Sequence, residues 1–265
     1  MADLRDEIRE QRYDVAIDFQ GAVRSALVAK LSAAPIIFGF RQPRENAAAM
    51  FYTRQVQVRG GHIIEQNLSL ASAVTQEDSP GWRGDLPRDE AAERDCEQKF
   101  GSYYRQGFAI LNPGAGWGAK QWPAVRYGEV AKRLADELGV KSLINFGPGE
   151  EKLALTAALA SGSSARAITC SVTELIALTR RARIFVGGDT GPMHLAAALG
   201  VPVVAIFGPT NPARNGPYGT RCVVLRSLAS PTTFSHRPEP DEGMLGIAAE
   251  DVTAAAISLL KDRHE

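Results

Sequence analysis

The chain has 265 residues, of which 30 are basic and 30 are acidic. This balance gives no sign of a nucleic-acid partner, and the length predicts one large or two medium-sized domains. The three cysteines, Cys96, Cys170 and Cys222, lie far apart without C-x-x-C spacing, which argues against a disulfide scaffold or a zinc site and predicts buried thiols in a reducing compartment. Residues 1–14 are charged where a signal peptide is apolar, and no apolar run approaches the ~18 residues of a membrane span, so we expect a cytoplasmic protein.

Residues 1–104 are predicted to form a partial α/β domain. A helix carrying Leu4 and Ile8 precedes a strand within 13–20, a helix over 21–33, a strand at 36–40, a possible strand at 54–58 and a helix over 62–74. The polar stretch 75–89, which contains proline and glycine, leads to a charged helix that ends near Tyr104. This order is typical of the trailing half of an α/β domain, so we expect its opening strands to be missing.

Residues 105–246 show a strict alternation of apolar, β-type runs with helical patterns. Strands are predicted at 108–112, 141–147, 166–170, 183–188 and 201–208, and helices over 124–139, 150–161, 171–182 and 192–200. Ser171 and Glu174 have the spacing of a capping box, Gly139 and Gly200 stand where helices end, and Pro192 stands in a first helical turn. The pattern predicts a doubly wound, Rossmann-like parallel sheet of five or six strands, with its ligand at the carboxyl ends of the strands. A last helix is expected over 247–265.

The turn after the strand at 183–188 combines groups that suit a phosphate and a sugar. Its sequence, GGDTGPMH, places Asp189, Thr190 and Gly191 at the start of a helix, where unpaired N–H groups and the helix dipole bind anions. Asp189 is itself anionic and is better suited to accept hydrogen bonds from ligand hydroxyls beside the phosphate. The alternative is that Asp189 or Thr190 only caps the helix and that His194 only packs.

Three further loops follow strands at the same edge of the predicted sheet. In LNPGAGWGAKQWP (111–123), Gly114, Gly116 and Gly118 allow close backbone approach, and Lys120 either supplies a charge for phosphate or is merely solvated. Neither G-x-G-x-x-G nor the Walker A pattern is satisfied, which disfavours a P-loop protein or a nicotinamide-dependent oxidoreductase. In INFGPGEE (144–151), either Glu150 or Glu151 could hold a ribose diol or could serve the helix start. Together with the loop at 207–219, these turns converge on one crevice.

The segments around these loops resemble a known family. FVGGDTGPMHLAAALGVPVVAIFGPTNPARNGPYG (185–219) is similar to the signature of glycosyltransferase family 9, the ADP-heptose:lipopolysaccharide heptosyltransferases, and GAKQWPAVRYGEVAKRL (118–134) extends the match. YDVAIDFQGAVRSALVAKLSA (13–33) and RENAAAMFY (44–52) resemble the heptosyltransferase I branch. The resemblance covers nearly the whole chain. It implies the GT-B architecture, in which two Rossmann-like domains face a cleft, with residues 1–104 as an incomplete acceptor domain and 105–246 as the nucleotide-sugar domain.

The resemblance also implies an activity. Such an enzyme moves heptose from ADP-heptose to a Kdo-lipid A type acceptor in the inner core of lipopolysaccharide, inverts the anomeric centre, needs no metal or cofactor, and contacts the inner membrane peripherally. Catalytic roles are implied for Lys120 and Asp189. Donor contacts are implied for Gly116, Glu150, Thr190, Gly191 and His194, and contacts with the anionic acceptor for Arg24, Arg41, Arg44 and His62.

The sequence departs from the family at one point. The general base in the family is an aspartate in a Gly-Asp turn after the first strand, and this sequence contains no such segment. The resemblance therefore implies that on the order of 60 residues, two units of ~30 residues each, are missing. Asp18 is the nearby substitute, although a helix-capping role is favoured for it. Two alternatives follow: the chain transfers heptose, or it is a non-catalytic remnant that binds a nucleotide sugar.

Overall fold

The computed structural model describes residues 2–78, 81, 84–233 and 238–262, and the chain divides into two compact units, Met1–Trp82 and Arg83–Glu265. This division lies earlier than the predicted domain boundary at 104/105. The reason is that the charged helix α4 (Glu90–Gln106) packs against α7 (Val172–Arg181) of the second unit. Residues 79–80 and 82–83 of the predicted linker lie outside the described part of the chain.

The first unit is built on a three-stranded parallel sheet in the order β1-β2-β3. Its elements are α1 (Ala2–Glu10), β1 (Val15–Asp18), α2 (Val23–Leu31), β2 (Ile36–Phe40), the 3-10 helix η1 (Asn46–Phe51), β3 (Arg54–Val56) and α3 (Ile63–Thr75). The predicted order is confirmed, with β3 shorter than expected. Its core is small and centres on Ala26, Ile37, Ala48 and Tyr52. The ring of Tyr52 lies where a Cβ on Gly39 would stand, only 2.4 Å away, so a glycine is required there.

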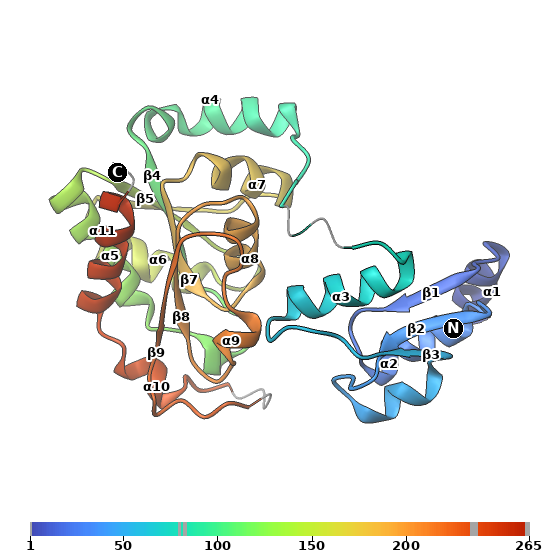
Figure 1. Cartoon of the computed structure of the whole chain (residues 1–265). Coiled ribbons are helices and arrows are strands. Elements are labelled where there is room, and N and C mark those ends of the chain that lie inside the picture. The colour runs from blue at the N-terminus through green and yellow to red at the C-terminus, as the bar shows by residue number, and fades with distance from the viewer. Residues whose placement is uncertain (1, 79–80, 82–83, 234–237, 263–265) are drawn as a thin grey trace. The chain divides into compact units, whose positions relative to one another are not determined.

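The second unit is a six-stranded parallel sheet with helices on both faces (Figure 1). Its strands are β4 (Phe108–Asn112), β5 (Lys141–Asn145), β6 (Ala165–Ile168), β7 (Ile184–Gly188), β8 (Val203–Phe207) and β9 (Cys222–Arg226). Its further helices are η2 (Gly118–Lys120), α5 (Ala124–Leu138), α6 (Glu151–Ala160), α8 (Gly191–Ala198), α9 (Pro212–Asn215), α10 (Glu242–Gly246) and α11 (Ala249–Lys261). The predicted doubly wound sheet is confirmed. The order β6-β5-β4-β7-β8-β9 reverses direction between β4 and β7, and such a switch point is where α/β sheets bind ligands.

The strands of the second unit are buried on both faces, which explains their continuous apolar sequences. Along β4, Phe108 and Ile110 pack with α4, α7 and α8, whereas Ala109 and Leu111 face the opposite core with α5, α6 and α11. Burial of this kind contributes roughly 25 cal/mol per Å² of apolar surface. The sheet is therefore a rigid base from which the carboxyl-end loops project.

The helix ends follow the sequence signals. Ser171 Oγ accepts from the N–H of Glu174 (3.2 Å) and Glu174 accepts from the N–H of Ser171 (2.8 Å), so the predicted capping box is present. Gly139 and Gly200 have the positive φ of helix ends, +66° and +72°, which glycine adopts without strain. The C-terminal helix starts at Ala249, slightly later than predicted, and residues 263–265 lie outside the described chain.

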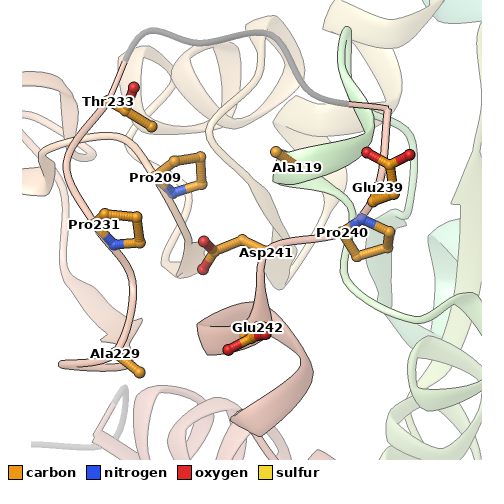
Figure 2. Close-up of a pocket in the computed structure, with 9 residues that line it drawn as sticks. All are labelled: Ala119, Pro209, Ala229, Pro231, Thr233, Glu239, Pro240, Asp241 and Glu242. Carbon is orange, nitrogen blue, oxygen red and sulfur yellow. The ribbon is translucent and has the colours of Figure 1, made fainter.

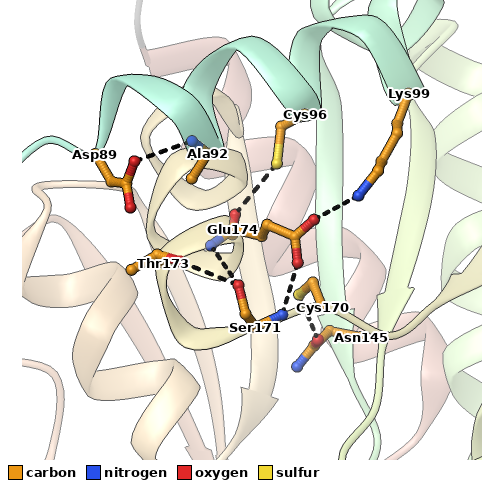
Figure 3. Close-up of polar contacts among 9 residues, drawn as sticks. All are labelled: Asp89, Ala92, Cys96, Lys99, Asn145, Cys170, Ser171, Thr173 and Glu174. Carbon is orange, nitrogen blue, oxygen red and sulfur yellow. Dashed lines mark hydrogen bonds and ion pairs between the residues drawn. The ribbon is translucent and has the colours of Figure 1, made fainter.

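The contact between α4 and α7 is a mixed polar and thiol cluster (Figure 3). Lys99 Nζ lies 2.6 Å from Glu174 Oε1, and the thiol of Cys96 donates to the backbone oxygen of Glu174 at 3.7 Å. Burial raises the pKa of Cys96 to about 11 and that of Cys170 to about 12, so both are inert neutral thiols. The prediction of three buried thiols is wrong for Cys222, which is exposed on the outermost strand β9, and Cys170 is only partly buried.

Candidate functional site

Two charged side chains from either side of the switch point meet at the carboxyl edge of the second sheet. Lys120 ends η2 in the loop after β4, and Asp189 directly follows β7. Lys120 Nζ lies 2.6 Å from Asp189 Oδ2 and 3.3 Å from the Asp189 backbone oxygen. On its other oxygen, Asp189 is 3.2 Å from Nε2 of His194, which lies on α8. The structure thus brings together three of the predicted site residues.

The Lys120–Asp189 pair is largely removed from water. The exposed fractions of the two side chains are 13% and 9%, whereas 42% of His194 is exposed. Burial raises the pKa of Asp189, but hydrogen bonds from His194 and Lys120 outweigh it and hold the pKa at about 2. The carboxylate is therefore ionised throughout the physiological range, and it fixes the lysine ammonium and the imidazole at the edge of the crevice.

Thr190, and not Asp189, occupies the N-cap position of α8, one of the two positions for which capping was the alternative. The Asp189 carboxylate is engaged by Lys120 and His194, while Thr190 occupies the N-cap position by backbone geometry. The Thr190 hydroxyl donates to the Gly188 carbonyl at 3.3 Å. Pro192 lies in the first turn as predicted, and Gly191 is exposed. The start of α8 therefore presents its dipole and backbone to the solvent side of the crevice.

A cavity of about 410 Å³ lies beside this helix start. It is lined by residues from the loops after four strands: Asn112, Gly114, Ala115, Gly116, Asn145, Phe146, Gly147, Pro148, Glu150, Cys170, Ser171, Val172, Leu175, Thr190, Gly191 and Pro192. The convergence that the sequence predicted is confirmed for the loops after β4, β5 and β7, and the loop after β6 contributes as well. The lining combines the glycines at 114, 116 and 147 with the apolar residues Phe146, Val172 and Leu175.

Glu150, rather than the exposed Glu151, belongs to this cavity. Its carboxylate accepts from the N–H of Gly147 at 2.8 Å. A Cβ placed on Gly114 would stand 2.1 Å from that carboxyl group, so any side chain there would displace the Glu150 carboxylate. By contrast, no described atom lies within 4 Å of a Cβ built on Gly116, whose surroundings are open.

A chain of hydrogen bonds ties the strand ends under the cavity. The thiol of Cys170 donates to Asn145 Oδ1 (3.4 Å), Asn145 Nδ2 donates to Asn112 Oδ1 (2.8 Å), and Asn112 Nδ2 donates to the Gly114 carbonyl (3.1 Å). Sequence reasoning missed these asparagines. The available signal was that two otherwise apolar strands, FAILN and KSLIN, both end in Asn. Their amides order the glycine loop from below.

Two other residues that sequence reasoning missed adjoin Lys120 and Asp189. The Lys120 ammonium lies 4.8 Å from the centroid of the Trp117 ring, a cation–π contact that restricts the lysine further. Thr210, in the loop after β8, is only 3% exposed and adds to the lowering of the pKa of Asp189. Both stand inside loops that the sequence singled out for their glycines, prolines and charges.

A second hollow of about 470 Å³ lies at the same edge of the unit and is acidic (Figure 2). Ala119 and Pro209, the neighbours of Lys120 and Thr210, line it together with Glu239, Asp241 and Glu242. Asp241 accepts from Ser230 Oγ (2.5 Å) and from the N–H of Gly243 (3.1 Å), and so caps α10. Because like charges repel, this hollow disfavours a phosphate, and the 410 Å³ cavity is the better anion site.

In the first unit, the four residues predicted to hold the acceptor all follow carboxyl ends of strands. Arg24 lies after β1, Arg41 and Arg44 after β2, and His62 after β3. The three arginines are exposed. His62 is buried and serves as the N-cap of α3, where its Nδ1 accepts from the N–H of Ile64 at 3.2 Å. A parallel sheet therefore gathers these residues along one edge, with His62 already committed to a structural contact.

Asp18, at the end of β1, is a structural residue. It is 4% exposed, and its carboxylate accepts from Tyr52 Oη (2.7 Å), Ser25 Oγ (3.0 Å) and the N–H groups of Gln20 and Gly21. Its side chain thus organises the turn into α2. The structural role that the sequence favoured agrees with these contacts, but Asp18 does not cap α2 itself, whose N-cap position is Ala22.

Within the described residues, no helix is long and apolar enough to cross a membrane. In the same part of the chain, no three His, Cys, Asp or Glu side chains are grouped as metal ligands would be.

Comparisons with a family model and with known proteins point to the same family. A family model described as glycosyltransferase family 9 (heptosyltransferase) matches residues 1–243. Lipopolysaccharide heptosyltransferase 1 of Pseudomonas aeruginosa is 32% identical over 231 residues, 84% of this chain and 62% of that protein. The enzyme of the same name from Escherichia coli K12 is 28% identical over 230 residues, 84% of this chain and 70% of that protein. The chain thus spans less than two thirds of the length of the Pseudomonas relative.

Solved structures agree with this family and confirm the α/β fold with parallel sheets. Escherichia coli ADP-heptose lipopolysaccharide heptosyltransferase II superposes with a TM-score of 0.77 at 22% identity, covering 100% of this chain and 82% of that one. Escherichia coli heptosyltransferase WaaC with ADP gives a TM-score of 0.71 at 25% identity, covering 97% of this chain and 77% of that one. Sequence and fold therefore lead to one conclusion: the chain belongs to glycosyltransferase family 9, the heptosyltransferases.

Proposed function

We propose that the second unit binds ADP-heptose in the 410 Å³ cavity and that the protein transfers the heptose to an inner-core lipopolysaccharide acceptor. The observation that carries this proposal is the meeting of Lys120 and Asp189, at 2.6 Å, across the switch point of the sheet. A lysine at that point, next to the start of α8, offers positive charge where a doubly wound fold binds a diphosphate.

The cavity accounts for each part of a nucleotide sugar. The diphosphate would lie against Thr190 and Gly191, which line the cavity, and would reach the Lys120 ammonium held on the preceding residue, Asp189, while Glu150 would accept from the ribose hydroxyls. The base would pack between the apolar side chains of Phe146, Val172 and Leu175 on the far side. Asp189 and His194 would face the sugar. Gly116, whose surroundings are open, leaves room for the phosphates.

The transfer chemistry follows from these placements. Displacement at the anomeric carbon passes through an oxocarbenium-like state while negative charge builds on the departing diphosphate. Lys120 and the dipole of α8 stabilise that charge. In this proposal they take the place of a metal ion at the leaving diphosphate. Direct displacement inverts the anomeric centre. A base must also take the proton of the acceptor hydroxyl.

The acceptor side of the proposal rests on the first unit. Arg24, Arg41 and Arg44 are exposed and follow neighbouring parallel strands. Their planar guanidinium groups suit the carboxylate and phosphate groups of a Kdo-lipid A type acceptor. His62 would contribute through its ring edge while its Nδ1 holds the cap. A lipid-linked acceptor would bring this unit to the cytoplasmic face of the inner membrane as a peripheral contact.

A second candidate function is favoured by Asp18. The carboxylate that stands nearest to the role of general base accepts four hydrogen bonds from the protein itself. Those contacts occupy the carboxylate, and with only 4% of the residue exposed an acceptor hydroxyl has little access to it. The alternative is therefore a protein that binds the nucleotide sugar without transferring it.

Calorimetric titration with ADP tests the donor site. Wild-type protein should bind ADP saturably, and Lys120→Ala should weaken binding at least about tenfold, the range expected for one contact to a charged group. Lys141→Ala is the matched control, because Lys141 is an exposed lysine at the amino end of β5, the opposite edge of the sheet. Absence of ADP binding, or equal losses in the two variants, would contradict the proposal.

A transfer assay separates the two candidate functions. Protein is incubated with ADP-heptose and Kdo-lipid A in the presence of a chelator, and the release of ADP is followed. Transfer should proceed with the chelator present, and the product's anomeric configuration, read by NMR, should be inverted relative to the donor. Saturable ADP binding with no release of ADP would establish the non-catalytic function instead.

A further inference from the structure

Thr210 holds a buried hydroxyl that the fold leaves without a partner. It lies three residues after β8, and β8 is the direct neighbour of β7, which carries Asp189. The residue is 97% buried, as its 3% exposure shows, and within the described residues Oγ1 makes no hydrogen bond of acceptable geometry. Buried polar atoms are nearly always paired, so an exception calls for a physical explanation.

The environment of Thr210 points to Asp189 as its partner. Gly188 and Ile206 are partners in the register of β7 and β8, so Asp189 and Thr210 follow neighbouring strand ends, and Thr210 is among the groups that lower the pKa of the carboxylate although its Oγ1 makes no hydrogen bond in the present geometry. A change in the χ1 angle of threonine moves Oγ1, and the hydroxyl can then donate to a neighbouring carboxylate. Thr179, another buried threonine whose hydroxyl makes no hydrogen bond, lies on α7 next to the core residue Leu178 and is not among the groups that shift the pKa of Asp189.

The ammonium of Lys120 is fully used by its present contacts. It donates to Asp189 Oδ2 and to the Asp189 backbone oxygen, and its remaining side faces the Trp117 ring. A diphosphate that contacts Lys120 must therefore take at least part of the ammonium from Asp189. A carboxylate with only 9% exposure would then lose part of its compensation, which is costly because buried charge needs partners.

We infer that Thr210 is a positioning residue of the donor site, whose hydroxyl donates to the Asp189 carboxylate when Lys120 turns to the diphosphate of the ligand. The inference rests on the proposed function, because it requires a diphosphate in the crevice. When Lys120 contacts the diphosphate, Asp189 keeps two partners, Thr210 and His194, and its carboxylate stays ionised and oriented. Because Thr210 is buried, water does not compete with the carboxylate for its hydroxyl.

Three variants test this role by ADP calorimetry and urea unfolding. Thr210→Val keeps the shape and removes the hydroxyl, and it should weaken ADP binding about tenfold while leaving the unfolding midpoint unchanged or slightly raised. Thr210→Ser retains the hydroxyl and should bind ADP within about twofold of wild type. Thr179→Val is the matched control, an equally buried hydroxyl that does not line the cavity, and should not change ADP binding.

Adenosine, which has no phosphate, distinguishes a positioning role from a merely structural one, because a structural defect would weaken the binding of ADP and adenosine alike. Thr210→Val should leave adenosine binding unchanged, because without a diphosphate Lys120 stays on Asp189. Equal losses for ADP and adenosine, an unchanged ADP affinity in Thr210→Val, or a folded Thr210→Ser that fails to recover it would each overturn the inference alone. Wild-type protein that does not bind ADP would overturn the proposed function, and this inference with it.

Discussion

Each of the two parallel sheets places a buried aspartate at the carboxyl end of a strand, and the two carboxylates have different partners. Asp18 of the first unit accepts from hydroxyls and backbone N–H groups, all of which belong to its own turn or to its core. Asp189 of the second unit holds a lysine and a histidine that border a crevice. Neutral local donors make a carboxylate part of the scaffold, whereas charged or ionisable side chains from separate elements make it a candidate part of a site.

Asp18→Ala tests the structural half of this comparison and should have the largest effect. Several buried donors lose their acceptor at once, so we expect the first unit to lose about 3 kcal/mol of stability. Hydrogen exchange of peptides within 15–56 would measure the loss, and ADP affinity should stay unchanged. Ser25→Ala removes one of the donors and should cost about 1 kcal/mol. A large fall in ADP affinity would show instead that Asp18 belongs to a binding site.

Asp189→Ala tests the other half. Lys120 and His194 both lose their anchor, so the affinity for ADP-heptose should fall by about thirtyfold to a hundredfold, while exchange in the first unit stays the same. Calorimetry measures the affinity, and Asp136→Ala, an exposed acid on α5 of the same unit, is the control. The idea of a donor-facing carboxylate fails if the two variants bind alike.

Acidification should weaken the second unit through Asp189. Its pKa lies at about 2 in the folded protein against an ordinary value of 3.8. Because the folded-state pKa is the lower one, the stabilisation is present above about pH 4 and is lost as the pH falls towards 2. The contribution is on the order of 2 kcal/mol. Urea midpoints of wild type should drop across this window, and those of Asp189→Asn should drop less; parallel curves would show that the carboxylate is not held by its partners.

The sequence sufficed to predict the second sheet because its strands are apolar on both faces and its helices carry cap signals. Ser171 with Glu174, and Gly139 and Gly200 at the helix ends, are local signals whose outcome depends on neighbouring residues alone. The crevice was predictable for the same reason, since parallel topology sends every loop after a strand to one edge.

What the sequence could not show is which side chains pair across that edge. Lys120 and Asp189 are 69 residues apart, and the 2.6 Å contact depends on the order β4-β7 in the sheet. The same holds for Thr210, whose isolation in the core is a property of packing and leaves no trace in a motif. The two compact units divide earlier than the predicted boundary for a related reason, because the packing of α4 on α7 is a long-range contact.

Glu150 is a third carboxylate in a loop that follows a strand. The variant Gly114→Ala tests whether it belongs to the scaffold, like Asp18, or to the site, like Asp189. A Cβ at position 114 would stand 2.1 Å from the Glu150 carboxyl group and must displace it, whereas Gly116→Ala adds a methyl group to open space. If Glu150 holds a ligand, the first variant should weaken ADP binding about tenfold at nearly constant stability, and the second should stay within about twofold of wild type. If Glu150 only orders the turn at Gly147, Gly114→Ala should instead lower the unfolding midpoint and leave ADP affinity unchanged. Because the carboxylate has one backbone partner, the N–H of Gly147, and otherwise borders the cavity, we expect the first result.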